Sequence, residues 1–218
     1  MSALGRGFAA LLLMIPLLAC AQTASEPYQE GTHYELINPP QPTASSTTVE
    51  VVEVFWYACP HCFHLEPALE SWLKHKPANV TFLRMPAVFN PSWELLSRAY
   101  YAAEDLGVLD KIHGPLLHAI HEEHKPMNSD KNLISFFTAH GVKDDDIRNA
   151  MSSFSVETKL RRAKQMGERY GLTGVPAIIV NGKYRTNVSM AGSNDAVFKV
   201  VDFLIKKESA APHRTTAY

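Results

Sequence analysis

Strand-like and helix-like hydrophobic patterns alternate in the first half of the chain. Residues 49–57 carry β-branched and aromatic side chains on both faces, which is typical of a buried central strand. Residues 63–73 have apolar side chains at helical spacing, and residues 80–85 return to a strand pattern. We therefore predict a strand–helix–strand unit with a right-handed crossover and an at least partly parallel sheet.

The pattern is helical from residue 91 to residue 170. Apolar residues recur three and four positions apart, and Gly107, Gly141 and Gly171 interrupt or end the periodic segments. Connections inside a small α/β domain usually span only a few residues. Residues 91–170 are therefore predicted to form an inserted helical subdomain.

A strand pattern reappears at residues 174–180, where Asn181-Gly182 predicts a tight hairpin into a return strand that starts at residue 183. Residues 194–207 then have the pattern of an amphipathic helix. Residues 49–90 and 171–208 are thus expected to form one α/β domain. Residues 22–48, rich in Pro, Ser and Thr, are predicted to be an extended arm with little regular structure, and residues 209–218 a flexible tail.

Charge and composition narrow the range of functions. The chain of 218 residues has 21 Lys and Arg against 22 Asp and Glu, with a formal net charge of −1. It has no basic block and no basic–aromatic interleaving, so no nucleic-acid partner is expected.

The first residues have the pattern of a targeting segment. Arg6 precedes an apolar run over residues 8–18, and Ala19-Cys20-Ala21 is a small-residue cleavage site, which predicts a signal peptide over residues 1–21. A second interpretation stays open, because Leu17 to Cys20 resembles a bacterial lipobox, whose signal would end before Cys20 and leave that residue lipidated. Either interpretation places the mature protein outside the cytoplasm, where disulfides form and persist.

Of the three cysteines, only Cys59 and Cys62 lie in the body of the chain. Cys59 stands at the predicted start of a helix, where unpaired N–H groups and the helix dipole stabilise a thiolate. Cys59 is therefore the candidate nucleophile, and Cys62 the candidate resolving thiol. A structural staple is disfavoured because such a short loop gives little entropic stabilisation.

Glu53 is an acid within the predicted central strand. If it is buried, its pKa rises and it can exchange protons. If it lies near an edge, it touches solvent, and the pattern alone leaves both interpretations open.

The spacing Cys59-Pro60-His61-Cys62 beside a βαβ pattern is a thioredoxin-like signal, and Val175-Pro176 at the start of a later strand strengthens it, with Pro176 either initiating the strand or forming a cis bond. From about residue 28 to residue 207, the chain resembles the DsbA family of bacterial disulfide oxidases. The shared motifs are Phe-Trp-Tyr-Ala-Cys-Pro-His-Cys, Gly-Val-Pro-Ala and Val-Asn-Gly-Lys-Tyr. The resemblance implies an α/β, thioredoxin-like fold with an inserted helical subdomain.

The resemblance also assigns roles to individual residues. It makes Cys59 the surface nucleophile, Cys62 its buried partner, and Pro60-His61 the family's dipeptide, in which His61 stabilises the thiolate. It makes Val175-Pro176 the loop that docks the substrate backbone, and Glu53 the family's buried acid. Glu66 falls where the family carries an acid near the site. Arg84 falls where a Lys is usual, so the positive charge is kept but does not titrate.

The function implied by the resemblance is that of a periplasmic thiol:disulfide oxidoreductase that donates its Cys59–Cys62 disulfide to folding secreted proteins with free cysteines. No cofactor beyond that disulfide is implied, and a membrane quinone reductase of the DsbB type would reoxidise the dithiol. We expect a monomer, because the residues between the signal and the first strand are too few for a separate dimerisation domain.

Two alternatives remain from the residues themselves. A thioredoxin-superfamily reductase or isomerase would use the same thiol pair. A metal-binding protein would use Cys59, Cys62 and a nearby His, although structural zinc usually takes four ligands and the chain has no second C-x-x-C. The histidines of the helical insert, among them His113 and His121, are predicted to lie on a solvated polar face.

Overall fold

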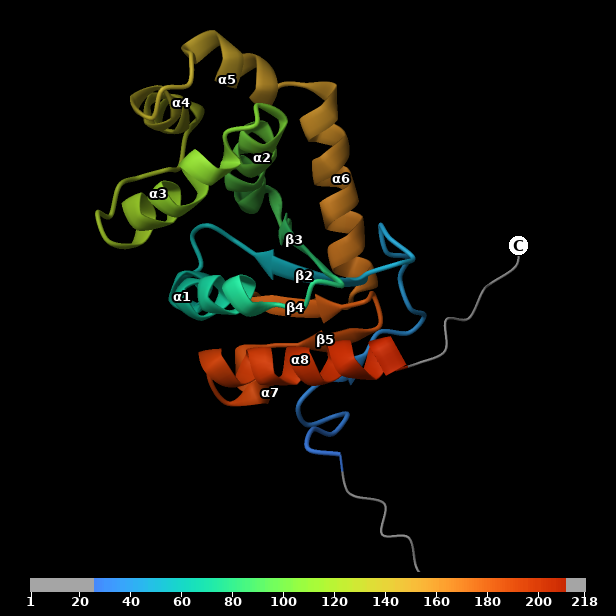
Figure 1. Cartoon of the computed structure of the whole chain (residues 1–218). Coiled ribbons are helices and arrows are strands. Elements are labelled where there is room, and N and C mark those ends of the chain that lie inside the picture. Colours follow the sequence, from blue (N-terminus) through green and yellow to red (C-terminus); the bar gives the residue numbers. More distant parts are fainter. Residues whose placement is uncertain (1–25, 211–218) are drawn as a thin grey trace, which may run out of the picture.

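The computed structural model describes residues 26–210, which fold around a five-stranded sheet of order β1-β5-β4-β2-β3. Figure 1 shows a group of helices above this sheet and α8 beneath it. The strands are β1 (Glu35–Leu36), β2 (Val49–Phe55), β3 (Val80–Pro86), β4 (Ala177–Val180) and β5 (Tyr184–Thr186). The helices are α1 (Pro60–His75), α2 (Pro91–Asp105), α3 (Leu109–His121), α4 (Asp130–Ala139), α5 (Asp144–Met151), α6 (Phe154–Arg169), α7 (Val188–Ala191) and α8 (Asn194–Ala210).

Strand β2 lies inside the sheet, between β4 and β3, and all seven of its residues are buried. It pairs in parallel with β3 and antiparallel with β4. The predicted βαβ unit is therefore present as β2–α1–β3, and the predicted hairpin as β4–β5. Both turn residues of that hairpin, Asn181 and Gly182, have a positive φ, as a tight turn of this kind requires.

Successive residues of β2 face two different cores because side chains alternate along a strand. Val49 and Val51 pack with residues of α1 and α8 on one face. Val52 and Val54 pack with Met166 of α6 on the other. The sheet is thereby covered by helices on both faces, as the nearly continuous apolar pattern of β2 predicts.

Helices α2 to α6 run consecutively between β3 and β4 and share one large apolar core. That core extends to the end of β2 and includes Phe55, Tyr57, Cys59 and Cys62. The helical part of the molecule therefore packs directly against the cysteine motif, and α3 lies beside α1 in this region (Figure 1).

The arm before residue 49 departs from the expectation of little regular structure. It contributes β1, which pairs antiparallel with β5, and it buries Tyr34 and Ile37. A two-residue strand of this kind depends on a sheet edge supplied by a distant part of the sequence, which local periodicity does not reveal. At the other end, α8 runs to Ala210, into the predicted tail. The expected signal peptide, Cys20 and most of the tail lie outside the described residues.

Within residues 26–210, no helix combines the length and apolar character needed to cross a membrane.

Candidate active site

Cys59 is the N-cap residue of α1, with an extended backbone (φ −88°, ψ 115°) and Pro60 at the first helical position. Proline suits this position because its fixed φ is helical and the missing N–H would have no partner there. The N–H groups of the first turn, those of His61 and Cys62, are consequently free to face the sulfur of Cys59. Cys59 and Cys62 are both free thiols, with exposed fractions of 8% and 2%.

The two thiols differ strongly in acidity. A hydrogen bond from Cys62 lowers the pKa of Cys59 to about 6, against the opposing effect of burial. The backbone N–H groups of Cys62 and His61 and the charge on His61 act in the same direction. For Cys62, the interaction with Cys59 and burial raise the pKa far above that of an ordinary thiol. Cys59 is therefore the sulfur that carries negative charge, and Cys62 the one that keeps its proton.

The loop that precedes β4 lies against Cys59. The Val175–Pro176 peptide bond is cis, and the Cys59 thiol donates a hydrogen bond to the carbonyl oxygen of Val175 at 3.5 Å. The structure thus brings together two motifs separated by more than a hundred residues of sequence, and the backbone at Val175 stands next to the reactive sulfur.

Glu53 is 1% exposed, so the structure selects the buried interpretation of this acid. Its register partner on β3 is Arg84, whose Nε donates to Oε2 of Glu53 at 3.0 Å. Burial raises the pKa of Glu53 to about 8, although Arg84 opposes the increase. Arg84 also donates to the carboxylates of Glu66 and, at 3.3 Å, Glu70. One arginine therefore serves three acids, and one of these, Glu53, contributes to the raised pKa of Cys62.

His113 corrects the prediction of a solvated histidine face. It is 7% exposed, and its Nδ1 is hydrogen-bonded to the Tyr57 hydroxyl at 3.0 Å. Its Nε2 is 3.7 Å from Oε1 of Glu66, too long for a hydrogen bond but close enough for an electrostatic contact. Burial by itself would raise the pKa of Glu66, but His113 and Arg84 outweigh it and hold that pKa below its usual value. Burial also lowers the pKa of His113.

His121 is half-buried, and its Nε2–H donates to the backbone carbonyl oxygen of Tyr57 at 2.7 Å. A signal for His113 was present in the sequence, because His113, Leu116, Leu117 and Ile120 are spaced as one apolar helical stripe. The prediction gave more weight to the polarity of the histidines than to that spacing.

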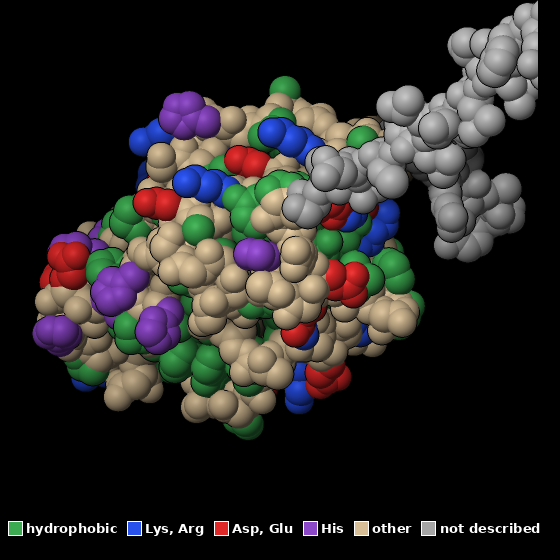
Figure 2. Space-filling model, turned by 90° about the horizontal axis from the view of Figure 1, so that it is seen from below, with side chains coloured by type: hydrophobic (Ala, Val, Ile, Leu, Met, Phe, Trp, Pro, Cys, Tyr) green, Lys and Arg blue, Asp and Glu red, His purple; other side chains and the backbone are tan. Residues whose placement is uncertain are grey.

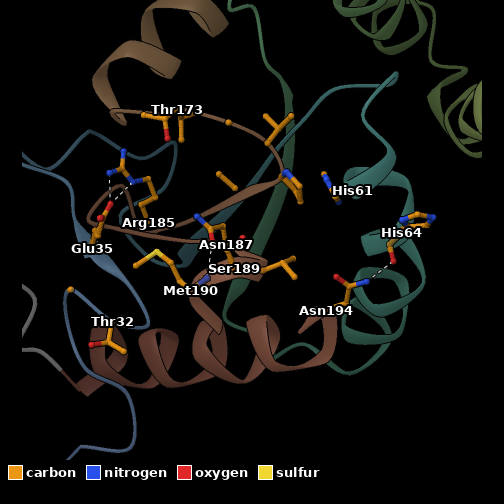
Figure 3. Close-up of a pocket in the computed structure, with 17 residues that line it drawn as sticks. Thr32, Glu35, His61, His64, Thr173, Arg185, Asn187, Ser189, Met190 and Asn194 are labelled. Atoms are coloured by element: carbon orange, nitrogen blue, oxygen red, sulfur yellow. Dashed lines mark hydrogen bonds and ion pairs between the residues drawn. The ribbon is translucent and has the colours of Figure 1, made fainter. Parts of the chain in front are cut away.

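A groove of about 720 Å³ runs from the motif along the side of the sheet (Figure 3). His61 and His64 of α1 stand at one end, and the ion pair between Arg185 and Glu35 lies toward the other. Val175 and Pro176 also line the groove. Glu35 and Arg185 could not be predicted as residues of this groove, because their pairing depends on the contact between β1 and β5.

No set of three or more His, Cys, Asp or Glu side chains with metal-binding geometry occurs in the part of the chain that the structure describes. Figure 2 shows several histidine side chains gathered on the left side of the molecule, where α1 and α3 lie in Figure 1. On the rest of that face, side chains of both charges are scattered without a single-sign patch.

Comparison with known proteins identifies a family and several relatives that are similar to this chain. A family model described as a DSBA-like thioredoxin domain matches residues 81–204. The chain is 36% identical over 202 residues to the thiol:disulfide interchange protein DsbA of Pseudomonas aeruginosa, which covers 93% of this chain and 95% of that protein. It is 33% identical over 199 residues to the protein of the same name from Burkholderia cepacia, with 90% and 94% covered.

Solved structures of proteins with related sequences have a similar fold. The crystal structure of Pseudomonas aeruginosa DsbA has a TM-score of 0.80 at 36% identity, covering 84% of this chain and 95% of that chain. That of DsbA from Xylella fastidiosa has a TM-score of 0.79 at 31% identity, with 84% and 99% covered. The expected α/β, thioredoxin-like fold with inserted helices is confirmed. Because the family model begins after the cysteine motif, the likeness at Cys59 and Cys62 depends on the relatives matched over most of their length.

Proposed function

The chain belongs to the family of DsbA-like thioredoxin-domain proteins and is a thiol:disulfide oxidoreductase, and from this premise we propose that Cys59 and Cys62 are its redox centre and that it works as an oxidase. The observation that carries the proposal is the unequal acidity of the two thiols. A thiol that is stabilised as a thiolate leaves readily from a disulfide, so the reduced form is favoured and the disulfide is a strong oxidant.

The exchange proceeds in two steps. The thiolate of a client protein attacks Sγ of Cys59, the Cys59–Cys62 bond breaks, and Cys62 leaves and takes up a proton because its pKa is high. A mixed disulfide then joins the client to Cys59. A second client thiolate attacks the client sulfur of that bond, and Cys59 leaves as a thiolate. The client loses two electrons and gains a disulfide, while the enzyme becomes a dithiol.

The surroundings of Cys59 support roles for four more residues. His61 contributes an N–H group and a charge that favour the Cys59 thiolate. The backbone at Val175-Pro176 lies beside the reactive sulfur and lines the groove, so we assign this loop to docking the client backbone. Glu53, buried under the motif beside Arg84, is assigned to the proton balance of Cys62, whose pKa its charge helps to raise.

Partners and location follow from the same premise. We propose that the clients are secreted proteins that fold in the periplasm. This chain would enter the periplasm through the signal peptide at residues 1–21, or would be anchored there by a lipid on Cys20. Reoxidation is assigned to a membrane quinone reductase of the DsbB type, and the chain is expected to act as a monomer. The redox-active disulfide is the only redox group that this chemistry needs. The relatives' shared name, thiol:disulfide interchange protein DsbA, supports a role in exchanging disulfides with client proteins.

An equilibrium titration of the purified protein against glutathione buffers tests the oxidase proposal. We expect the disulfide to be largely reduced in buffers that leave a thioredoxin-like disulfide intact, because the Cys59 thiolate stabilises the dithiol form. A disulfide that resists reduction as firmly as that of a thioredoxin would assign the protein to the reductases. Cys59→Ser and Cys62→Ser proteins, which cannot close the bond, provide the baseline.

A further inference from the structure

Two histidines on one side of α3 each connect the segment before Cys59 with the segment after Cys62. His113 and His121 are eight residues apart, slightly more than two helical turns, and Leu117, 3% exposed, lies midway between them. Both histidines contact Tyr57, which precedes Cys59 by two residues. Each also contacts a residue of α1 that follows Cys62. Helix α3 therefore spans the redox motif from the side of the helical insert.

The contacts of His113 define its tautomer. Burial raises the pKa of Tyr57 well above its usual value, so its hydroxyl keeps its proton and can donate to Nδ1 of His113. In the neutral ring, Nε2 then carries the hydrogen, and this atom faces the Glu66 carboxylate at 3.7 Å. Glu66 lies four residues after Cys62, one turn further along α1. The imidazole is thus held between a tyrosine on one side of the motif and a carboxylate on the other.

His121 makes the second connection. Its Nε2–H donates to the carbonyl oxygen of Tyr57 at 2.7 Å, so the tautomer is fixed by the backbone acceptor. Its ring stacks on Phe63, with a centroid distance of 4.9 Å and an interplanar angle of 17°. Phe63 directly follows Cys62 in α1. The side chain therefore links the turn that leads into Cys59 with the residue that comes after the motif.

We infer that His113 and His121 are positioning residues of the redox centre. These two side chains connect Tyr57 to helix α1, and this set of contacts, called the clasp, holds the turn that places the Cys59 sulfur at the helix N-terminus. This inference rests on the proposed function, since it concerns how readily the same disulfide is given away. Neither histidine is shown in contact with either sulfur, so the effect passes through Tyr57, Phe63 and Glu66.

The clasp affects the dithiol form more than the disulfide form. In the oxidised protein, the covalent bond between Cys59 and Cys62 already restricts the motif. In the reduced protein, only non-covalent contacts keep the N–H groups of His61 and Cys62 directed at the thiolate. The structure, which has free thiols, contains the full clasp. Loss of the clasp should therefore raise the pKa of Cys59 and make the disulfide a weaker oxidant.

The test uses three variants and one matched control, all in the full-length mature protein. Tyr57→Phe removes the hydroxyl that bonds to His113 and keeps the ring. His121→Ala removes the donor to the Tyr57 carbonyl, and His121→Gln puts back an N–H donor of similar reach. His118→Ala is the control, because His118 lies on the same helix and is bonded to Glu122 and Glu123 on the exposed side. Each protein is titrated against glutathione, and the Cys59 thiolate is followed by ultraviolet absorbance as a function of pH.

For Tyr57→Phe and for His121→Ala we expect the equilibrium constant for oxidising glutathione to fall roughly five-fold, the effect of one net hydrogen bond, and the apparent pKa of Cys59 to rise. His121→Gln should recover part of this loss, and His118→Ala should match the wild type. If Tyr57→Phe and His121→Ala only lower the melting temperature and leave both redox readouts at wild-type values, the inference is overturned. The comparison is between variant and wild type, so it is decided independently of whether the wild-type value is that of an oxidase or a reductase.

Discussion

Glu53 and Arg84 face each other across the parallel strands β2 and β3, with 3.0 Å between Nε of Arg84 and Oε2 of Glu53. Opposite charges at this distance normally favour ionisation of the acid. Burial of Glu53 is nevertheless the larger effect, and it raises the pKa of this carboxyl to about 8. Arg84 divides its donors among Glu53, Glu66 and Glu70, so its charge does not fully offset the cost of burying any one of these carboxylates.

The raised pKa of Glu53 predicts a stability that falls with increasing pH. The folded protein keeps the proton between the usual pKa of 4.5 and a pKa of about 8, while the unfolded chain releases it, so the free energy of unfolding decreases through this interval. Glu53→Gln should stabilise the protein by about 2 kcal/mol at pH 8 and by much less at pH 4.5. Urea unfolding of both proteins across this range measures the difference, and an equal gain at every pH would contradict the assignment.

Removing the shared cation should have the opposite effect. Arg84→Met would leave Glu53, Glu66 and Glu70 close together without a counter-charge, and the loss of stability at pH 7 is expected to be about 3 kcal/mol. Arg84→Lys keeps the charge but loses the branched donor geometry, so it should cost about 1 kcal/mol. Chemical denaturation of the three proteins provides the ranking. A methionine variant as stable as the lysine variant would show that the charge itself is unimportant.

The lowered pKa of Cys59 predicts that pH affects the two redox forms differently. In the reduced protein the folded pKa of about 6 lies below the usual value of 9.0, so between these values the unfolded chain binds more protons and the stability rises with pH. The advantage is lost as the pH falls through 6. The oxidised protein has no thiol to titrate at this site and serves as the control. The difference in unfolding free energy between the reduced and oxidised forms should therefore shift in favour of the reduced form from pH 5 to pH 8.5, and a constant difference would contradict the assigned pKa.

The place of the cysteine motif and the buried strand before it could be predicted from the sequence because both depend on local signals. The continuous apolar pattern of residues 49–57 predicted the buried β2, and the position of Cys59 before a helical pattern predicted its place at the N-terminus of α1. The helical insert followed from the long change of period between residues 91 and 170. These features need no knowledge of distant contacts.

The hydrogen bonds and ion pairs of the site could not be predicted from local sequence signals. Whether Glu53 is buried or solvated depends on where β3 and α1 lie, and the single acid in an apolar run was compatible with both. The pairing of Glu35 with Arg185 depends on β1 joining β5 across 150 residues of sequence. His113 was misassigned because a histidine on an apolar helical stripe becomes acceptable only when a partner such as Tyr57 is present to satisfy its ring nitrogen.

Gly107 and Gly182 have similar backbone conformations but different surroundings. Their alanine variants therefore distinguish the cost of backbone strain from the cost of a steric clash. Gly182 (φ +64°) and Gly107 (φ +67°) both occupy the left-handed region, but a Cβ on Gly182 would collide with the carbonyl oxygen of Gln41, whereas a Cβ on Gly107 would meet nothing within 4 Å. Gly107→Ala should therefore cost about 1 kcal/mol from strain alone. Gly182→Ala should cost about 3 kcal/mol, because the arm must also move off the β4–β5 hairpin. Thermal unfolding compares them, and equal losses would mean that the arm adapts freely.

The unequal roles of the two sulfurs predict which single-cysteine variant captures clients. In Cys62→Ala, Cys59 is first loaded by oxidised glutathione as a mixed disulfide, and the thiolate of a client with a single cysteine then displaces glutathione from Cys59. Neither a second client thiol nor Cys62 is present to attack this bond, so covalent complexes should accumulate. Loss of the hydrogen bond from Cys62 should also raise the pKa of Cys59 above 6, while the N–H groups of the first turn keep it below 9.0. Cys59→Ala should capture none, because Cys62 is only 2% exposed and its pKa is far above the ordinary value. Non-reducing electrophoresis before and after a reductant, with the double variant as a blank, gives the readout, and complexes of similar yield in both single variants would show that the second sulfur is also an accessible nucleophile.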